Sequence, residues 1–320
     1  NIVQLTFNSS FAKSLVSMYA FPAKVLKKLS VNSFIAYYDF ISNCVTNVFE
    51  KTYDIAIDFY GYGSFVTAFL ATKIQAKKKA TWLHDEKPYW MKSVQKYLCE
   101  YDKIYGVSQA VVDAFCREYP HYKDKAAVFY NVIDIEEIKR KSEQDEIIPF
   151  KESFNIVTVG RLTEQKGYDI AIKAASILKK RKINFAWYAI GGGRDEKKLK
   201  KLVEKYCLEN QFVFLGRKKN PYPYMKHCDL YVQPSRHEGY VITLVEARAL
   251  CLPILSSDIP SAREQIQDGI NGYVAELSAE DLADKIEYLY NNPSQRKKTV
   301  EYLKEHPIDF STELLKLEII

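Results

Sequence analysis

Short apolar segments alternate along the chain with longer segments in which apolar residues recur every three to four positions. Short continuous apolar runs are typical of strands buried on both faces of a parallel sheet, and longer periodic segments are typical of helices. In the first part of the chain we expect strands at 2–7, 54–60, 79–83, 103–107 and 127–130 and helices at 64–76 and 109–118. Ser108 is the expected N-cap of the second helix, because its hydroxyl can accept a hydrogen bond from the first turn.

A polar, charged segment at 140–153, which contains Pro149, predicts a linker. After it we expect strands at 155–159, 185–190, 211–215, 230–233, 253–256 and 272–274 and helices at 167–180, 196–209, 222–227, 241–250 and 279–291. Strands that alternate with crossover helices predict an α/β fold with doubly wound parallel sheets. We therefore expect two Rossmann-like domains, at 1–148 and 149–305, that face each other across a cleft, and a tail at 306–320 that packs back on the first domain.

The composition is that of an ordinary globular protein, with 47% apolar and 27% charged residues. The net charge of +6 is too small to indicate a nucleic-acid partner, and no nucleic-acid-binding motif accompanies it. Lysines concentrate at 73–79, in a first part rich in Tyr and Phe, and this would suit peripheral contact with an anionic membrane. The alternative is a solvated helix end.

The six cysteines are scattered without a CxxC spacing, and several lie in apolar runs. This usage predicts reduced thiols and a cytoplasmic location, with peripheral contact at the inner face of the cell membrane as a further expectation. The five histidines show no HExxH spacing, so we expect no metal site. No apolar run is long enough to predict a membrane-spanning helix.

The loop VGRLTEQKG at 159–167 joins an expected strand to an expected helix, and Arg161 and Lys166 flank it. Ligands bind at the carboxyl ends of strands in open parallel sheets, where two cations and a helix N-terminus suit a phosphate or a diphosphate. The alternative is a solvated basic loop. The segment AIGGGRDEKKL at 189–199 has Glu196 where a dinucleotide-binding motif has its third glycine, so it does not indicate a hydride-transfer cofactor.

The segment SRHEGYVITLVEARA at 235–249 places Glu238 at the mouth of an expected helix and Glu246 about two turns into it. Eight helical residues span at most ~12 Å, which is roughly the length of a sugar, a diphosphate and a ribose laid along the helix start. This spacing indicates one carboxylate for sugar hydroxyls, helix amides for phosphate and one carboxylate for ribose hydroxyls. Two surface glutamates are the alternative.

His84 follows an expected strand in the first part of the chain, within ATWLHDEKPYW. Its position at the carboxyl end of a strand favours a functional role, although a lone histidine is more often a packed or surface residue. Gly61 and Gly63 stand at another strand–helix junction, DFYGYGSFV, where glycine permits close approach of the backbone. A plain turn is the alternative there.

Three motifs together resemble the retaining GT-B glycosyltransferases of family 4: GRLTEQKG, the segment GRKKNPYPYMKHCDLYVQPSRHEGYVITLVEARALCLPILSSD, and DGINGYV. The resemblance runs from about residue 53 to the C-terminus. It implies a GT-B fold and a metal-independent hexosyltransferase without a cofactor. This enzyme would move a sugar with retention from a nucleotide-diphosphate donor, most often a UDP-sugar, to a sugar hydroxyl of a lipid-linked or polysaccharide acceptor. NPYPYMK is similar to enzymes of bacterial capsule, O-antigen and exopolysaccharide synthesis.

The resemblance implies a role for each residue that matches a motif. Arg161 and Lys166 would hold the donor diphosphate, Glu238 would lie beside the donor sugar, and Glu246 would bind the ribose. The turn would face the phosphates through the amides of Gly239, Tyr240 and Val241. His84 would lie near the reacting centre, and Arg217 would pack near the nucleotide base.

The front of the chain departs from the family pattern. No strand with a glycine-rich loop precedes the segment NIVQLTF, so we expect that the first part of the N-terminal domain is absent and that activity of this chain alone is in doubt. Two other functions remain open. One is a nucleotide-sugar epimerase or hydrolase of the same fold, and the other is a non-catalytic, degenerate glycan-binding scaffold.

Overall fold

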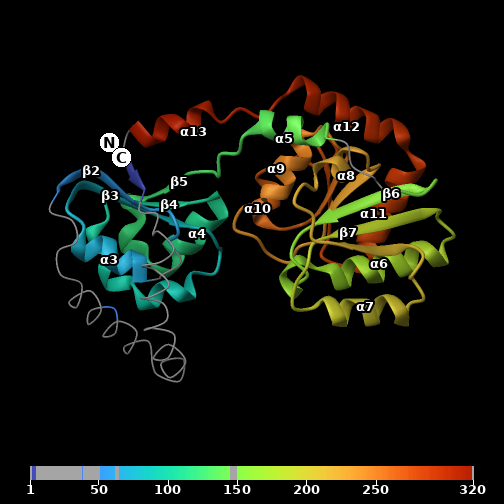
Figure 1. Ribbon diagram of the computed structural model, residues 1–320, viewed down its shortest axis with the longest axis horizontal. Coiled ribbons are helices and arrows are strands. Elements are labelled where there is room, and N and C mark those ends of the chain that lie inside the picture. Colours follow the sequence, from blue (N-terminus) through green and yellow to red (C-terminus); the bar gives the residue numbers. More distant parts are fainter. Residues whose placement is uncertain (1, 5–37, 39–50, 62–64, 145–149, 319–320) are drawn as a thin grey trace. The chain divides into compact units, whose positions relative to one another are not determined.

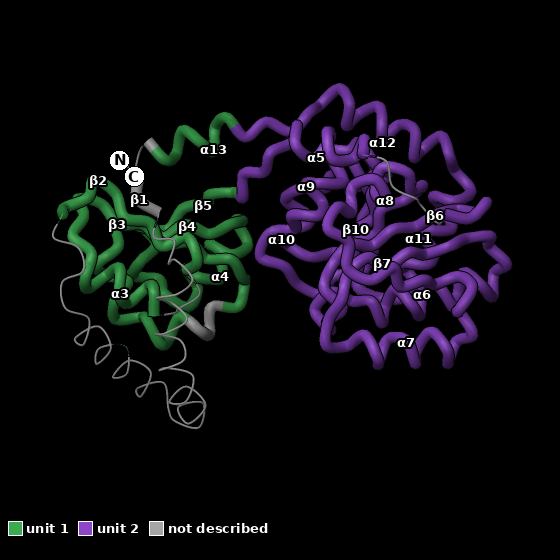
Figure 2. Tube along the Cα trace, in the orientation of Figure 1, with its two compact units in different colours: residues 1–130, 311–320 green, residues 131–310 purple. Residues whose placement is uncertain are grey.

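The computed structural model describes residues 2–4, 38, 51–61, 65–144 and 150–318. The chain divides into two compact units, unit 1 (Asn1–Tyr130 with Ser311–Ile320) and unit 2 (Asn131–Phe310), which Figure 2 distinguishes by colour. Each unit is built on one parallel sheet, which confirms the predicted α/β fold with two Rossmann-like domains. Among the described residues, no helix combines the length and the apolar character needed to cross a membrane.

The sheet of unit 1 contains five parallel strands in the order β1-β2-β3-β4-β5, so the described strands follow one another in sequence order. Their bounds are Ile2–Gln4 (β1), Tyr53–Asp58 (β2), Ala76–Leu83 (β3), Lys103–Gly106 (β4) and Ala126–Val128 (β5). The described helices are α3 (Phe65–Lys73), α4 (Gln109–Glu118), α13 (Ser311–Leu315) and the 3₁₀ helices η1 (Pro88–Ser93), η2 (Gln95–Glu100), η3 (Pro120–Lys125) and η5 (Lys316–Glu318). Ser108 accepts a hydrogen bond from the amide of Val111, which confirms the predicted N-cap of α4.

The C-terminal segment returns to unit 1 beside β5. The carboxylate of Glu313 accepts a hydrogen bond from the Tyr130 amide at 3.0 Å, and Lys316 donates to the carbonyl of Val128 at 3.0 Å. Lys316 also pairs with Glu313 at 2.7 Å. These polar contacts hold the last described helices against the end of the unit 1 sheet.

The sheet of unit 2 contains six parallel strands in the order β11-β10-β9-β6-β7-β8. Their bounds are Phe154–Val159 (β6), Phe185–Ile190 (β7), Phe212–Gly216 (β8), Leu230–Gln233 (β9), Ile254–Ser257 (β10) and Tyr273–Ala275 (β11). The helices are α5 (Ile135–Ser142), η4 (Glu164–Lys166), α6 (Tyr168–Lys180), α7 (Glu196–Lys205), α8 (Tyr222–Lys226), α9 (Ile242–Ala249), α10 (Pro260–Arg263), α11 (Ala279–Asn291) and α12 (Pro293–Glu305).

The central strands of unit 2 are buried on both faces, as the continuous apolar runs predict. Side chains of β7 alternate between two core clusters, with Phe185, Trp187 and Ala189 in one and Ala186, Tyr188 and Ile190 in the other. The first cluster includes residues of α6, α7 and α11, and the second includes residues of α8, α9, α10 and α12. Figure 1 accordingly shows α6 and α7 on one side of the sheet and α8 and α9 on the other.

The strand order of unit 2 reverses at β6. From β6 the chain winds outward to β7 and β8, and it then returns to β9 on the other side of β6 and winds toward β11. In a doubly wound sheet, the loops that follow the two strands at such a reversal point in opposite directions and leave a crevice at the carboxyl ends. The loops after β6 and β9 therefore occupy the place where a ligand is expected to bind.

The segment expected to be a linker is partly helical. Residues 135–142 form α5, whose first turn is capped by Asp134 through a hydrogen bond from the Glu137 amide at 2.8 Å. Helix α5 packs against α8 and α9, so the division between units falls at Tyr130 and Asn131 rather than at residue 148. Helix α12 was also absent from the expected elements, because the segment 293–305 is mostly polar and buries few residues, among them Thr299 and Leu303.

Candidate functional site

A cavity of about 400 Å³ opens at the carboxyl ends of β6, β7 and β8 in unit 2. It is lined by Val159, Gly160, Arg161, Ile190, Gly191, Gly192, Arg217, Lys218 and Pro221. Three of these residues are cationic, none is acidic, and neither Arg161 nor Arg217 forms an ion pair with any residue in the described part of the chain. The cavity is therefore positively charged and available to an anion.

Arg217 lies directly over the glycine run that follows β7. A Cβ atom on Gly192 would fall 2.8 Å from Nε of Arg217, so a larger residue at this position would push the guanidinium away. The run of glycines thus accommodates Arg217 and the neighbouring loop backbone. The need for close approach therefore accounts for these glycines, and no dinucleotide-binding role is needed to explain them.

The loops after β6 and β9 contact each other backbone to backbone. Gly167, the N-cap residue directly before α6, has a left-handed φ of 66°, and a Cβ atom there would lie 1.8 Å from the carbonyl oxygen of Pro234. The amide of Arg236 donates to the carbonyl of Gln165 at 2.8 Å, and the side chain of Gln165 donates to the carbonyl of His237 at 3.1 Å. These contacts fix the distance between the two loops.

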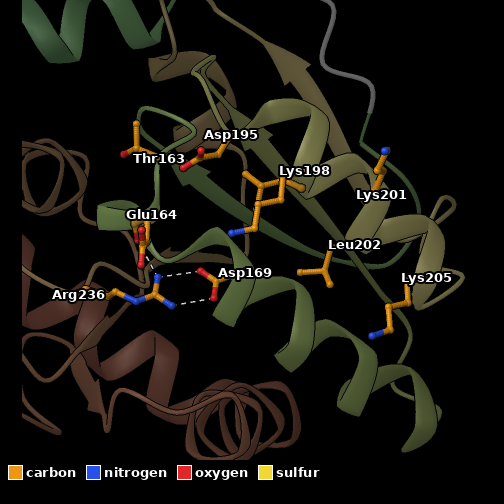
Figure 3. Close-up of a pocket in the computed structure, with 10 residues that line it drawn as sticks. Thr163, Glu164, Asp169, Asp195, Lys198, Lys201, Leu202, Lys205 and Arg236 are labelled. Carbon is orange, nitrogen blue, oxygen red and sulfur yellow. Dashed lines mark hydrogen bonds and ion pairs between the residues drawn. The ribbon is translucent and has the colours of Figure 1, made fainter.

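Arg236 strengthens the same junction. Its guanidinium bonds both carboxylate oxygens of Asp169 at 2.7 Å and the carbonyl of Glu164 at 2.7 Å (Figure 3). Burial of the Asp169 carboxyl raises its pKa, but the two Arg236 bonds outweigh this effect, so the pKa is lowered and the pair stays ionised. A second cavity of about 240 Å³ adjoins this ion pair and is lined on its other side by lysines of α7.

Lys166 and Glu238 meet at the reversal of the sheet, although they are far apart in sequence. Their Nζ and Oε1 atoms are 2.6 Å apart, and their side chains are only 15% and 9% exposed. The aliphatic part of Lys166 lies beside Gly160, which lines the cationic cavity. The structure thus brings this ion pair to the edge of that cavity.

A chain of buried hydrogen bonds also holds Glu238. Ser235 donates to the same oxygen, Oε1, at 2.7 Å, and it accepts a hydrogen bond from Nε2 of Gln233 at 2.6 Å. The Gln233 oxygen accepts in turn from Tyr231 and Thr243, each at 2.8 Å. Sequence patterns did not single out Ser235 or Gln233.

Glu246 lies on α9 and contacts a residue of α8. The phenol of Tyr222 donates to Oε1 of Glu246 at 3.0 Å. Burial raises the pKa of Glu246, and the hydrogen bond from Tyr222 offsets this effect only in part. Tyr222 follows Pro221, which lines the cationic cavity, so the contact between Tyr222 and Glu246 begins one residue along the chain from that lining.

The turn before α9 contains Gly239, Tyr240 and Val241. Helix α9 starts at Ile242, and no described side chain caps its first turn. The first amides of a helix have no partner within the helix and carry a partial positive charge. The amides of Ile242 and Leu244 donate to the carbonyls of Tyr240 and Val241, so the N–H groups that the sequence predicts for an anion are those of the turn itself, at 239–241.

His84 lies in unit 1, at the carboxyl end of β3. Its Nε2 atom is 2.6 Å from the carbonyl oxygen of Phe59, and its ring meets the ring of Phe59 edge to face. Burial lowers the pKa of His84, and the Phe59 carbonyl and the charge of Asp58 oppose this effect. The neutral ring is therefore favoured, with Nε2 protonated to donate to the carbonyl.

The structure thus brings Lys166 together with Glu238, and Arg161 together with Arg217, within unit 2. It also adds three residues that sequence analysis did not identify as part of the site: Ser235, Tyr222 and Lys218. Position beside a predicted strand end could have indicated Lys218, but the contacts of Ser235 and Tyr222 depend on folding. In the described part of the chain, no group of three or more His, Cys, Asp or Glu residues is arranged to hold a metal ion.

Comparison with known structures shows the fold. The crystal structure of Anabaena HepE in complex with UDP has a TM-score of 0.70 and 17% identity, covering 92% of this chain and 83% of that one. A crystal structure of Staphylococcus aureus TarM in complex with fondaparinux, α-GlcNAc-glycerol and UDP has a TM-score of 0.70 and 20% identity, covering 90% and 58%. The chain therefore has the GT-B fold.

Curated relatives carry closer sequence similarity. An uncharacterized glycosyltransferase of Methanocaldococcus jannaschii is 33% identical over 172 residues, which are 52% of this chain and 40% of the relative. The N-acetylgalactosamine-N,N'-diacetylbacillosaminyl-diphospho-undecaprenol 4-alpha-N-acetylgalactosaminyltransferase of Campylobacter jejuni is 30% identical over 184 residues, which are 54% of this chain and 49% of the relative. The chain thus spans about half the length of the curated relatives it matches.

The family comparison covers most of unit 2. Residues 139–306 match the family described as glycosyl transferases group 1, and this region includes the cationic cavity, the Lys166–Glu238 pair and Glu246. The matched region is more than half of the 320-residue chain. The chain therefore belongs to the glycosyl transferases group 1.

Proposed function

We propose that this chain is a glycosyltransferase that moves a sugar from a nucleotide-diphosphate donor to a hydroxyl of a glycan or lipid-linked glycan acceptor. A UDP-sugar is the favoured donor. The observation that carries the proposal is the cationic cavity at the carboxyl ends of β6, β7 and β8, whose lining residue Gly160 lies beside Lys166 of the buried Lys166–Glu238 pair. A nucleoside diphosphate has the matching charge. The family membership supports the same chemistry.

The donor would lie along the carboxyl edge of the unit 2 sheet. Arg161 and Lys166 would bind the diphosphate, and the amides at 239–241 would add hydrogen bonds from the start of α9. Arg217 would pack near the base, since its guanidinium lies over the glycine turn that lines the cavity. No cofactor is required for this arrangement.

The two ends of the donor would contact the two glutamates. Glu246, supported by Tyr222, would accept hydrogen bonds from the ribose hydroxyls. Glu238 would accept hydrogen bonds from the donor sugar and stabilise the positive charge that develops there. This assignment explains why a helix that buries one side carries a carboxylate: its partner is a polar ligand.

The reaction breaks the bond between the sugar C1 atom and the oxygen of the diphosphate. Negative charge then develops on the diphosphate, and Arg161, Lys166 and the helix amides would stabilise it. The acceptor hydroxyl forms the new bond to C1 and passes its proton to an oxygen of the departing diphosphate. We propose retention of the anomeric configuration, a metal-independent mechanism and a role for His84 near the reacting centre, in line with the resemblance to family 4.

The acceptor is proposed from the relatives. The name of the Campylobacter jejuni relative describes transfer to a diphospho-undecaprenol-linked sugar, and an Erwinia amylovora relative, 34% identical over 128 residues, is named for amylovoran biosynthesis. We propose a similar role in cell-surface polysaccharide synthesis, with the protein in the cytoplasm and in contact with the inner face of the membrane. Within the lysine cluster at 73–79, Lys77 pairs with Asp54 and Lys79 donates to the carbonyl of Ala71.

The proposal is tested by incubating the 320-residue chain with UDP- and GDP-sugars, one at a time, with and without an undecaprenyl-diphosphate-linked sugar. We expect one donor to raise the melting temperature and to yield a glycosylated acceptor. Products formed from the donor alone would instead indicate an epimerase or a hydrolase. Binding without turnover would indicate a non-catalytic scaffold, and Glu238→Gln serves as a control with strongly reduced but measurable turnover.

A further inference from the structure

An unbroken line of hydrogen bonds runs from the interior of unit 2 to Glu238. Tyr231 and Thr243 donate to the Gln233 oxygen, the Gln233 amide donates to Ser235, and Ser235 donates to Oε1 of Glu238. The four distances lie between 2.6 and 2.8 Å. Tyr231, Gln233 and Ser235 are each at most 1% exposed, so water does not compete for these bonds.

The direction of each hydrogen bond follows from its neighbours. Burial raises the pKa of Tyr231, so its phenol remains a donor and faces the Gln233 oxygen rather than the nitrogen. The Gln233 NH₂ group then faces Ser235, whose hydroxyl proton is left for Glu238. If the Gln233 amide were rotated by half a turn, its oxygen would face Ser235 and accept the hydroxyl proton. The oxygen of Ser235 would then face Oε1 of Glu238 without a proton between them, which is unfavourable.

Such polar side chains are uncommon in a buried parallel strand. Strands of this kind are typically continuous apolar runs, because a buried polar group costs free energy unless it is fully hydrogen-bonded. Gln233 ends β9 and Ser235 follows it, so both stand where β9 reaches the reversal of the sheet. Apolar residues would pack equally well at these positions, so packing does not explain why the side chains here are polar.

We propose that Ser235 and Gln233 are positioning residues that hold one oxygen of Glu238 in place and leave the other oxygen, Oε2, to the donor sugar. Lys166 bonds Oε1 as well, whereas Oε2 accepts no hydrogen bond from any described residue. With Oε1 bound by two donors, the carboxylate cannot rotate without losing both. This inference rests on the proposed function and assigns to it the residues that orient Glu238.

The test compares Ser235→Ala with Ser261→Ala in the full 320-residue chain. Ser261 is also fully buried, but its hydroxyl has no partner among the described residues, so its removal controls for loss of a buried hydroxyl. For Ser235→Ala we expect turnover of the active UDP-sugar to fall about ten- to hundredfold, because a hydrogen bond to a charged group is lost. We expect the affinity for UDP, measured by calorimetry, to stay unchanged, because UDP lacks the sugar that Glu238 contacts.

A double-mutant cycle separates positioning from a structural role. If Ser235 acts through Glu238, then Ser235→Ala will reduce turnover in the wild type but will add little in the Glu238→Gln background. A merely structural role would reduce turnover by the same factor in both backgrounds and would overturn the inference. Equal turnover in Ser235→Ala and Ser261→Ala would also overturn it.

Gln233→Glu provides a second variant that keeps the size of the side chain. Its carboxylate accepts hydrogen bonds from Ser235 as well as from Tyr231, so the serine proton turns away from Glu238. We expect the same loss of turnover as in Ser235→Ala, and wild-type turnover would contradict the inference. If the wild type turns over none of the UDP- and GDP-sugars, the proposed function fails, and this inference fails with it. If the wild type is active but both variants keep its turnover, only this inference fails.

Discussion

The two units use similar sheets in different ways at their carboxyl edges. In unit 1 the described strands follow one another in sequence order, whereas in unit 2 the order reverses at β6. A reversal separates two neighbouring loops, and the crevice between them can admit a ligand. In unit 2 those loops carry Lys166 and Glu238, so the topology accounts for where the candidate donor site lies.

A buried carboxylate in each unit shows the same difference at the level of atoms. Asp58 is 1% exposed, and both of its oxygens are used within unit 1: Oδ1 accepts from the Gly61 amide, and Oδ2 accepts from Thr67 and Thr81. Glu238 uses only Oε1 within unit 2. A carboxylate with both oxygens occupied stabilises a turn, whereas one with an available oxygen can bind a ligand.

The largest effect is expected when the ion pair of unit 2 is broken. Lys166→Met should lower turnover about a hundred- to thousandfold, because a charge that stabilises the leaving diphosphate is removed. It should also lower the free energy of unfolding by about 3 kcal/mol, because Glu238 is left buried without its cation. Activity assays and urea denaturation measure the two effects separately.

Two further variants control for this result. Lys197→Met removes an exposed lysine of α7 that forms no ion pair with the described residues, and it should leave both measurements unchanged. Lys166→Met combined with Glu238→Gln should recover part of the stability but none of the activity. A Lys166→Met variant with wild-type turnover would contradict the proposed role of the pair.

The corresponding change in unit 1 should affect stability alone. Asp58→Ala leaves one amide and two threonine hydroxyls without their acceptor, so we expect the free energy of unfolding to fall by about 3 kcal/mol. The affinity for UDP should not change, because the donor is proposed to bind unit 2. Calorimetry on the folded variant checks this, and weakened UDP binding would show that the two buried carboxylates are less distinct than their hydrogen bonds indicate.

A smaller effect is expected at the ribose end of the proposed site. Glu246→Gln should weaken UDP binding about tenfold, because a hydrogen bond from a ribose hydroxyl to a charged acceptor is replaced by a weaker one. Tyr222→Phe should weaken it less, since Tyr222 only orients the carboxylate. Glu204→Gln, at an exposed position of α7, is the matched control. Unchanged UDP affinity in Glu246→Gln would remove the ribose role.

Much of the fold follows from periodicity. The helix at 109–118, the strand at 185–190 and the helix at 279–291 have the predicted bounds, because each combines a long apolar pattern with clear turn or cap residues. Helix α5 could not be predicted in this way. Its only buried apolar residue is Ile138, so apolar periodicity does not mark it, and the helix is stabilised by the Asp134 cap, by the Lys141–Glu137 pair and by packing against α8 and α9.

The site was predictable only at the positions that motifs mark. Arg161, Lys166, Glu238 and Glu246 belong to recognisable segments, but the sequence could not show that Lys166 and Glu238 form one buried pair, because 72 positions separate them. Ser235 and Tyr222 carry no local signal of their own. Ser235 matters because it donates a hydrogen bond to Glu238, three positions away. Tyr222 matters because it donates a hydrogen bond to Glu246, which lies on another helix.

The smallest effect concerns pH, where burial acts in opposite directions on the two units. Burial lowers the pKa of His84 in unit 1 and raises the pKa of Glu246 in unit 2 above its ordinary value of 4.5, because each environment disfavours the charged form. Below the unfolded pKa of His84, the unfolded chain therefore binds more protons at this residue, so its contribution to stability declines as the pH falls. The contribution of Glu246 declines as the pH rises through its raised pKa.

Binding of UDP should respond to Glu246 and also to the terminal phosphate of UDP, whose second pKa is about 6. The ribose hydroxyls donate to an ionised carboxylate, so UDP affinity should fall a few-fold as the pH is lowered from about 7 toward the raised pKa of Glu246, which lies above that of an exposed glutamate. Calorimetry across this range should give a shallower profile for Glu246→Gln than for the wild type, with the remaining slope due to the UDP phosphate, and an unchanged slope for His84→Ala. A slope in Glu246→Gln equal to that of the wild type would assign the titration to other groups, and a reduced slope in His84→Ala would mean that unit 1 takes part in nucleotide binding.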